Sequence, residues 1–384
     1  MAQNLRQVFK TYIYLHEMEN MIKNIITVLI ITFFHSFSQL PNLDELTWYS
    51  VKNNTMADVW PGEECGHSQR HVLDAWSSGA YDPNRHRMLI FGGGHNDYYG
   101  NEIYQFSIDS MKWSIAEKQS TGYLNCGGSC IEVLADGNPN SRHTYDALTF
   151  LIHNNKFMMI GGSLGCLSGG GADDSWWWDD ANGWIQKLSG GLHYELTKSA
   201  VYNPKDSCVY MQDYDGFKKY NPWTNSWSDI GGVVMGGGLC GAIDTSRNWF
   251  VNIGDGESYY YDLNEQPQCS KHNLNTTGGS SITNTQNPGV EYDPIADKIV
   301  CYAGGIVWSL DLESKSWTSF DINGKPSGSG AAYDYRIYGH FSYMPEYNTY
   351  IFIGGNPNDQ VYFFKYRLTK TKTISKPRNL TVSP

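Results

Sequence analysis

The chain has 384 residues and a formal net charge of −11 at pH 7, and 40% of its residues are hydrophobic. Binding to a phosphate backbone requires an excess of lysine and arginine, so this charge excludes a general nucleic-acid-binding protein. A few local arginines would still suffice to bind an anionic sugar polymer at short range. The 13 tryptophans, 27 tyrosines and 40 glycines are typical of many short strands joined by tight turns, which indicates an all-β protein.

The N-terminal segment is typical of a secretory signal. A charged stretch starts at Met21, an apolar run covers residues 25–34, and small residues follow at Ser36 and Ser38. About ten apolar residues are too few to span a bilayer. We therefore predict that residues 1–38 form a signal region, with translation starting at Met21. The mature chain would be secreted, periplasmic or extracellular, with no membrane span.

Export permits disulfide bonds, and the chain contains eight cysteines. Only Cys126 and Cys130, which lie close together in a glycine-rich stretch, suggest a local bridge. None of the other cysteines has the spacing of a metal-binding CxxC motif, and their connectivity stays open.

A repeated unit of four strands is the strongest pattern in the sequence. Its clearest copy, residues 80–113, has a strand, an Asp-Pro-Asn turn, an apolar strand ending on glycines, an aromatic strand and a last strand with Trp113. Glycines after the second strand let the backbone turn out of the sheet without a Cβ clash. The same order recurs, and three further copies close on Trp184, Trp227 and Trp317. The fourth unit lacks this tryptophan.

The two ends of the chain are predicted to pair with each other. The sixth unit stops after its third strand, at residues 361–368. Its missing tryptophan strand is expected at residues 46–51, where Trp48 would take the closing position. Such pairing would close a ring of sheets and remove both open edges. We expect the closing tryptophans to pack between neighbouring sheets.

The order of glycines, aromatics and tryptophan resembles the kelch repeat of the galactose-oxidase-like propellers, over about residues 46–368. The resemblance implies an all-β, kelch-type β-propeller spanning residues 39–368, with six blades favoured over seven. Residues 369–384 look like a linker or the first strand of a truncated C-terminal module. Kelch rings serve both as enzymes and as binding scaffolds, so the resemblance leaves the activity open.

Polar side chains gather at the sequence positions that a propeller brings to one face, before first strands and after second strands. The candidate catalytic residues are His143, His95, Tyr145, Arg142, His193 and His340. The candidate substrate-binding residues are Arg70, His71, Asn96, Tyr98, Arg336 and Tyr338. We expect these groups to converge at the axis, with His143 transferring a proton. Because side chains alternate along an extended stretch, only one of the two neighbours Arg142 and His143 should face the substrate.

Arginine beside histidine and tyrosine suits β-elimination on a uronic-acid-containing polymer. The arginine neutralises the carboxylate and acidifies the proton at C5, a histidine or tyrosine removes that proton, and another such group protonates the leaving oxygen. In residue types this is similar to the propeller polysaccharide lyases of the ulvan-lyase kind. The resemblance transfers no individual residue.

Other functions stay open. A non-catalytic glycan-binding or scaffold propeller would use its aromatic residues to stack on sugars. A copper-radical oxidase like galactose oxidase is less favoured, because the only His-Tyr neighbours are His193 and Tyr194, in reversed order, and no cysteine is matched. A glycosidase needs two facing carboxylates, for which Asp97, Asp173 and Asp174 are candidates.

Partners and cofactors follow from these alternatives. The glycine runs lack a following helix or a phosphate-binding lysine, which argues against a nucleotide cofactor. A structural calcium or zinc ion stays open. The expected partner is a polysaccharide or another glycan, and the expected state is a monomer.

Overall fold

The computed structural model describes residues 18, 21–23, 40–51, 54–187, 199–214, 216–232 and 236–367. The chain divides into two compact units. The smaller comprises residues 1–41 and 108–110, within which residues 18 and 21–23 are helical. Most of the expected signal region and the tail 369–384 lie outside the described residues, so both assignments remain predictions. No helix in the described part of the chain is long and apolar enough to cross a membrane.

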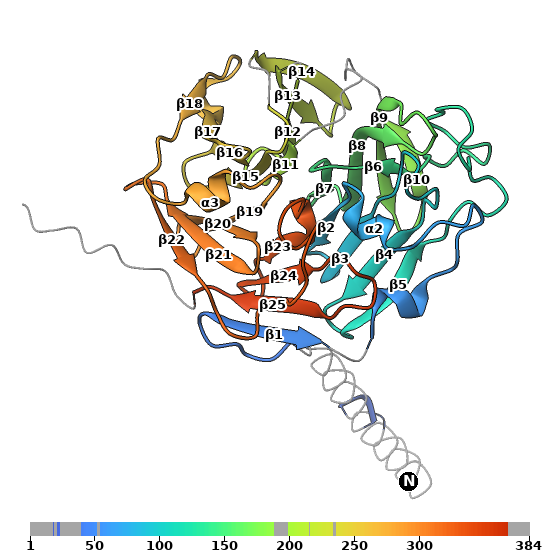
Figure 1. Ribbon diagram of the computed structural model, residues 1–384, viewed down its shortest axis with the longest axis horizontal. Helices are drawn as coiled ribbons and strands as arrows, with labels where there is room; N and C mark the ends of the chain where they lie inside the picture. The colour runs from blue at the N-terminus through green and yellow to red at the C-terminus, as the bar shows by residue number, and fades with distance from the viewer. Residues whose placement is uncertain are drawn as a thin grey trace, which may run out of the picture. The chain divides into compact units, whose positions relative to one another are not determined.

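The larger unit is a β-propeller of six antiparallel sheets (Figure 1). Blade 1 contains β2 (Ser78–Asp82), β3 (Arg87–Phe91), β4 (Ile103–Ser107) and β5 (Lys112–Glu117). Blade 2 contains β6 (Arg142–His143), β7 (Leu148–Leu151), β8 (Lys156–Leu164), β9 (Gly171–Asp179) and β10 (Gly183–Lys187). Blade 3 contains β11 (Ser199–Asn203), β12 (Cys208–Asp213), β13 (Gly216–Asn221) and β14 (Ser226–Gly231).

The remaining three blades have the same plan. Blade 4 contains β15 (Cys240–Asp244), β16 (Trp249–Gly254), β17 (Glu257–Asp262) and β18 (Lys271–Asn273). Blade 5 contains β19 (Gly289–Asp293), β20 (Lys298–Ala303), β21 (Ile306–Asp311) and β22 (Ser316–Phe320). Blade 6 contains β23 (Phe341–Met344), β24 (Thr349–Ile353), β25 (Val361–Lys365) and β1 (Thr47–Val51). The predicted count of six blades is confirmed.

Short helices lie in the connections between the strands. They are η1 (Met56–Val59), α2 (His71–Asp74), η2 (Leu263–Glu265), α3 (Ser280–Thr283) and η3 (Tyr338–His340). The first strands β2, β7, β11, β15, β19 and β23 contact one another in turn, and β23 contacts β2 again. The ring of first strands is therefore continuous around the axis.

The N-terminal strand β1 completes the sheet of blade 6. It pairs antiparallel with β25, and Trp48 lies opposite Phe364. The predicted pairing of the two chain ends is therefore present. It gives the last blade the same four strands as its neighbours, so β25 has no open edge.

The closing tryptophans occupy one register position in five blades. Their partners on the neighbouring strand are Phe106 for Trp113, Trp178 for Trp184, Tyr220 for Trp227, Leu310 for Trp317 and Phe364 for Trp48. In blade 4 the corresponding position holds Lys271, opposite Tyr261. The ring of Trp184 lies 5.4 Å from that of Phe91 in blade 1. Trp48 lies 5.7 Å from Tyr302 in blade 5, so these two rings pack between blades as predicted.

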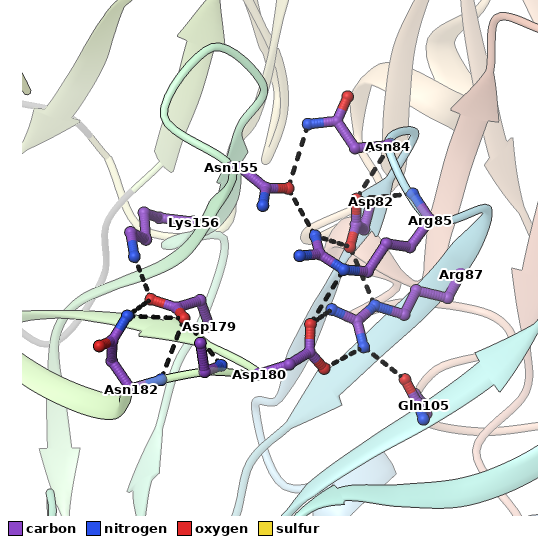
Figure 2. A network of polar contacts seen from close by, with 11 residues as sticks. Asp82, Asn84, Arg85, Arg87, Gln105, Asn155, Lys156, Asp179, Asp180 and Asn182 are labelled. Atoms are coloured by element: carbon purple, nitrogen blue, oxygen red, sulfur yellow. Dashed lines mark hydrogen bonds and ion pairs between the residues drawn. The ribbon is translucent and has the colours of Figure 1, made fainter.

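Ion pairs also join adjacent blades (Figure 2). Arg87 Nε donates to Asp82 at 2.9 Å within blade 1, while Arg87 Nη1 donates to Asp180 of blade 2 at 2.7 Å. Arg247 repeats the arrangement with Asp244 at 2.7 Å and Asp297 at 2.8 Å, between blades 4 and 5. The Asp82 side chain is fully buried, so Arg87 supplies the charge that this carboxylate requires.

The disulfides correct one sequence-based expectation. Cys65 bonds to Cys126, and Cys130 bonds to Cys166. The expected local bridge between Cys126 and Cys130 is therefore wrong, because each of them faces a different segment folded against the long loop 118–141. Cys208, Cys240, Cys269 and Cys301 are buried free thiols. Two disulfides are typical of proteins outside the cytoplasm.

Candidate functional site

Side chains from four connecting segments meet where the chain enters the first strands. We call this cluster the mouth and define it by Trp76, Asp97, His143, Tyr145 and Arg336. A glycine brings two of the segments together. Gly94 has φ +81°, and a Cβ on it would overlap the backbone nitrogen of His143. Only glycine tolerates this approach, which places the loop with Asp97 directly against β6.

His143 is held by a carboxylate. Its side chain is 5% exposed, and its Nε2 lies 2.8 Å from Asp97 Oδ2. The hydrogen bond from His143 keeps the pKa of Asp97 below its usual value despite partial burial, so Asp97 is ionised and accepts the Nε2 proton. Burial lowers the pKa of His143, although Asp97 opposes the change. At neutral pH the ring is therefore uncharged, and the lone pair on Nδ1 is free to take a proton.

Arg336 and Trp76 form a stack beside this histidine. Arg336 Cζ lies 3.7 Å from the centroid of the Trp76 ring. The centroids of the Trp76 and His143 rings are 4.9 Å apart, and the two ring planes are inclined by 31°. No carboxylate among the described residues pairs with the Arg336 guanidinium. Its hydrogen-bond donors are therefore available to an anionic ligand.

Tyr145 adds a phenol to the mouth. Its ring centroid lies 6.1 Å from that of His143. Burial raises the pKa of Tyr145, and the positive charge of Arg336 lowers it in part. The phenol is protonated at neutral pH and can therefore donate its hydroxyl proton. The arrangement thus combines a neutral base, a protonated acid and an unpaired cation, the three groups that proton abstraction beside a carboxylate requires.

Three other candidates surround this centre. His95 is exposed, and its ring centroid lies 6.0 Å from that of His143. His71 Nδ1 contacts Asp74 Oδ1 at 3.1 Å, and this hydrogen bond raises the pKa of His71. Asn96 is exposed, and its Oδ1 accepts a hydrogen bond from Tyr99 at 2.9 Å.

Comparison with known proteins gives no family assignment. No protein-family profile and no curated protein sequence matches the chain. One solved structure with similarity is a structural-genomics protein of unknown function from Bacteroides thetaiotaomicron, with a TM-score of 0.49 and 11% identity over 83% of this chain and 76% of that chain. Another is a fungal alcohol oxidase of the AA5 family in complex with copper, with a TM-score of 0.45 and 13% identity over 75% of this chain and 62% of that chain.

Two of the predicted catalytic residues do not reach the mouth. Arg142 is fully buried and forms a two-point ion pair with Asp174. It is thus a structural residue of blade 2, and its neighbour His143 is the one that faces the centre. His340 is also fully buried, and neither ring nitrogen has a hydrogen-bond partner among the residues that the structure describes. Burial lowers the pKa of His340 to about 4, so it is a neutral packing residue at pH 7.

Predicted substrate-binding residues divide in the same way. The Tyr98 hydroxyl donates to Glu102 Oε1 at 2.5 Å inside the fold, and the Tyr338 hydroxyl donates to Asn287 Oδ1 at 3.1 Å. Both tyrosines are buried structural groups. Arg70 is exposed, but its Nε pairs with Asp74 at 2.6 Å. His193 lies outside the described residues.

Trp76 was missed by the sequence analysis. It lies two residues before β2 (Ser78–Asp82), at one of the positions that send side chains to the mouth, but the sequence-based prediction named only polar and titratable residues there. An aromatic residue just before a first strand was the signal that would have identified it. Within the described residues, no group of three or more histidine, cysteine, aspartate or glutamate side chains is arranged to hold a metal ion.

Proposed function

We propose that this protein is a secreted, carbohydrate-active propeller that cleaves a uronic-acid-containing polymer by β-elimination. The observation that carries the proposal is the Arg336 guanidinium, which has no carboxylate partner among the described residues and stacks on Trp76 beside the His143–Asp97 pair. A substrate carboxylate would complete the ion pair that the protein leaves open.

Each step uses one group of the mouth. Arg336 binds the uronate carboxylate and stabilises the negative charge that develops when C5 loses its proton. His143 Nδ1 accepts this proton while Nε2 keeps its hydrogen bond to Asp97. The C5–H electron pair forms the C4=C5 double bond, and the C4–O bond breaks. Tyr145 gives its hydroxyl proton to the departing oxygen. The proton held by His143 then returns to Tyr145 through water, so both groups regain their starting protonation states.

Secretion is supported by two separate features. The disulfides Cys65–Cys126 and Cys130–Cys166 are typical of an oxidising compartment. The segment that starts at Met21 has the order of a secretory signal. A polymeric substrate is consistent with a location outside the cytoplasm.

The role of Arg336 is tested by two substitutions. Arg336→Ala should lower kcat/KM on a uronate polymer by about 30-fold or more, since removal of one partner of a desolvated charge pair costs roughly 2–5 kcal/mol. Arg336→Lys should keep part of the activity, because it retains the charge without the planar fork. Arg367→Ala is the matched control, since Arg367 pairs with Glu45 at 3.3 Å in blade 6. Equal activity of Arg336→Ala and the control would reject the proposal.

The alternative is a glycan-binding propeller without turnover. Arg336 and Trp76 would then bind an anionic sugar, and His143 would act as a hydrogen-bonding group. In that case the wild-type protein would be retained on a uronate polymer column, Arg336→Ala would elute early, and no unsaturated product would form.

A further inference from the structure

A partly open cavity lies along the propeller axis. It has a volume of ≈250 Å³ and is lined by residues of all six blades. Among its lining residues are Pro83, Pro204 and Pro345, which lie in the turns that join first to second strands. The mouth is built from the opposite ends of the first strands. The axial cavity therefore reaches the face of the propeller opposite the mouth.

Two carboxyl groups line this cavity, and neither pairs with a basic side chain among the described residues. They are Asp146, which follows Tyr145, and Glu291 on β19. Asp146 Oδ2 accepts hydrogen bonds from Ser199 Oγ at 2.7 Å and from the Gly241 amide at 3.0 Å. The described residues that line the cavity include no lysine, arginine or histidine. Ionised, the two carboxylates would carry two negative charges with no counter-charge in the wall.

The rest of the wall is mainly aromatic and aliphatic. Tyr81, Tyr202 and Tyr343 line the cavity. Their hydroxyls are already engaged by Glu346, His153 and Asn348, none of which lines the cavity. These three tyrosines thus contribute mainly the aromatic surface of their rings to the cavity, because their hydroxyls are already hydrogen-bonded elsewhere. Aromatic surface next to carboxylates favours an organic ammonium ion through cation–π attraction and charge-assisted hydrogen bonds.

The size of the cavity and the polar groups in its wall both favour an organic ammonium ion. Its volume corresponds to about eight water molecules at ~30 Å³ each. This is room for a short aliphatic amine. A protein site for a hard metal ion requires more ligands than two carboxylates, and no group of three acidic, histidine or cysteine side chains is found in the described residues.

We propose that the axial cavity binds a small organic ammonium ion, with Asp146 and Glu291 as its counter-charges, on the face opposite the mouth. This site is independent of the β-elimination at the mouth. Its ligand class follows from two carboxyl groups in the wall of one cavity that is otherwise lined mainly by aromatic and aliphatic residues, so a short diamine is the best match.

Proton release accompanies binding. Burial raises the pKa of Asp146 to about 7 and the pKa of Glu291 to about 8, and the charge of Asp146 also raises the latter. A cation stabilises the ionised carboxylates and so displaces their protons. Affinity should therefore increase with pH, by about tenfold or more between pH 6 and pH 8.

Isothermal titration of the full chain with 1,4-diaminobutane tests the proposal. We expect saturable binding at pH 8, with proton release seen as a dependence of the heat on the ionisation enthalpy of the buffer. The neutral isostere 1,4-butanediol should give no measurable binding. Asp146→Asn and Glu291→Gln should each weaken diamine binding by about tenfold or more, while exposed Asp321→Asn should bind like the wild type.

Folding is followed by thermal melting of each variant. Asp146→Asn is expected to fold because its amide oxygen still accepts the bonds from Ser199 and Gly241. Glu291→Gln is expected to fold because its amide oxygen still accepts the bond from the Tyr343 backbone. Equal binding of the diol and the diamine would overturn the proposal. Wild-type affinity in both folded variants, absence of diamine binding, or calcium chloride binding in place of the diamine would also overturn it.

Discussion

Replacement of His143 by alanine is expected to lower turnover on a uronate polymer by about two to four orders of magnitude, the usual range for the loss of a general base. The ring is neutral, its Nε2 is fixed by Asp97, and Nδ1 is the nitrogen left to accept a proton. His143→Gln provides the structural check, because its amide can still donate to Asp97. Steady-state rates of both variants, measured with their melting temperatures, separate lost chemistry from lost fold.

The pH profile supplies a second readout for the same residue. A base with a lowered pKa loses activity only when the pH falls below its ordinary value of 6.5, so wild-type kcat/KM should be level at neutral pH and decline in acid. His272→Ala is the matched control, since His272 lies on the outer strand of blade 4 and contacts Glu265 at 2.9 Å. Turnover by His143→Ala equal to that of this control would exclude His143 as the base.

Replacement of Trp184 by alanine is expected to lower the free energy of unfolding by about 3–5 kcal/mol. Its ring packs on Phe91 of blade 1 at 5.4 Å and on Trp176 of blade 2 at 6.4 Å, so its removal leaves a hole between blades. Trp223→Ala is the control, because Trp223 is 64% exposed to solvent. That change should cost about 0.5 kcal/mol or less.

Urea or thermal unfolding of both tryptophan variants measures the difference. Similar losses at the two positions would show that Trp184 does not stabilise the contact between blades 1 and 2.

The fold was predictable because its signals are local and repeat. A tryptophan at a fixed offset after a glycine turn defines a register, and one copy at each end of the chain predicts pairing between the ends. In the structure these two ends do pair, and Trp48 lies opposite Phe364. Blade 4 lacks the closing tryptophan, but the four-strand repeat is still recognisable there. Tyr261 occupies the position on the third strand that in other blades lies opposite the tryptophan.

The site was predictable only in part. Position in the repeat indicates which end of a blade a residue occupies, and the structure has Tyr145 close to both His143 and Arg336. It does not tell which way a side chain turns. Arg142 turns inward because Asp174, thirty-two positions away, supplies its partner, and His340 is covered by packing against the first blade. Contacts between residues so far apart in the chain cannot be recognised from the local sequence pattern.

The disulfides show the same limit. Spacing suggested a bridge within the long loop, but the pairing depends on which segments fold against it. Cys65 and Cys166 approach the loop from segments far apart in the chain.

The central claim is that Arg336, His143 and Tyr145 carry out β-elimination on a uronate polymer. The most direct test incubates the wild-type protein with such a polymer and with the same polymer after reduction of its carboxyl groups, and follows ultraviolet absorbance and the mass of the products. The account predicts unsaturated oligosaccharides from the native polymer and none from the reduced one. Products that have gained water, equal cleavage of both polymers, or no cleavage of any uronate polymer would contradict it.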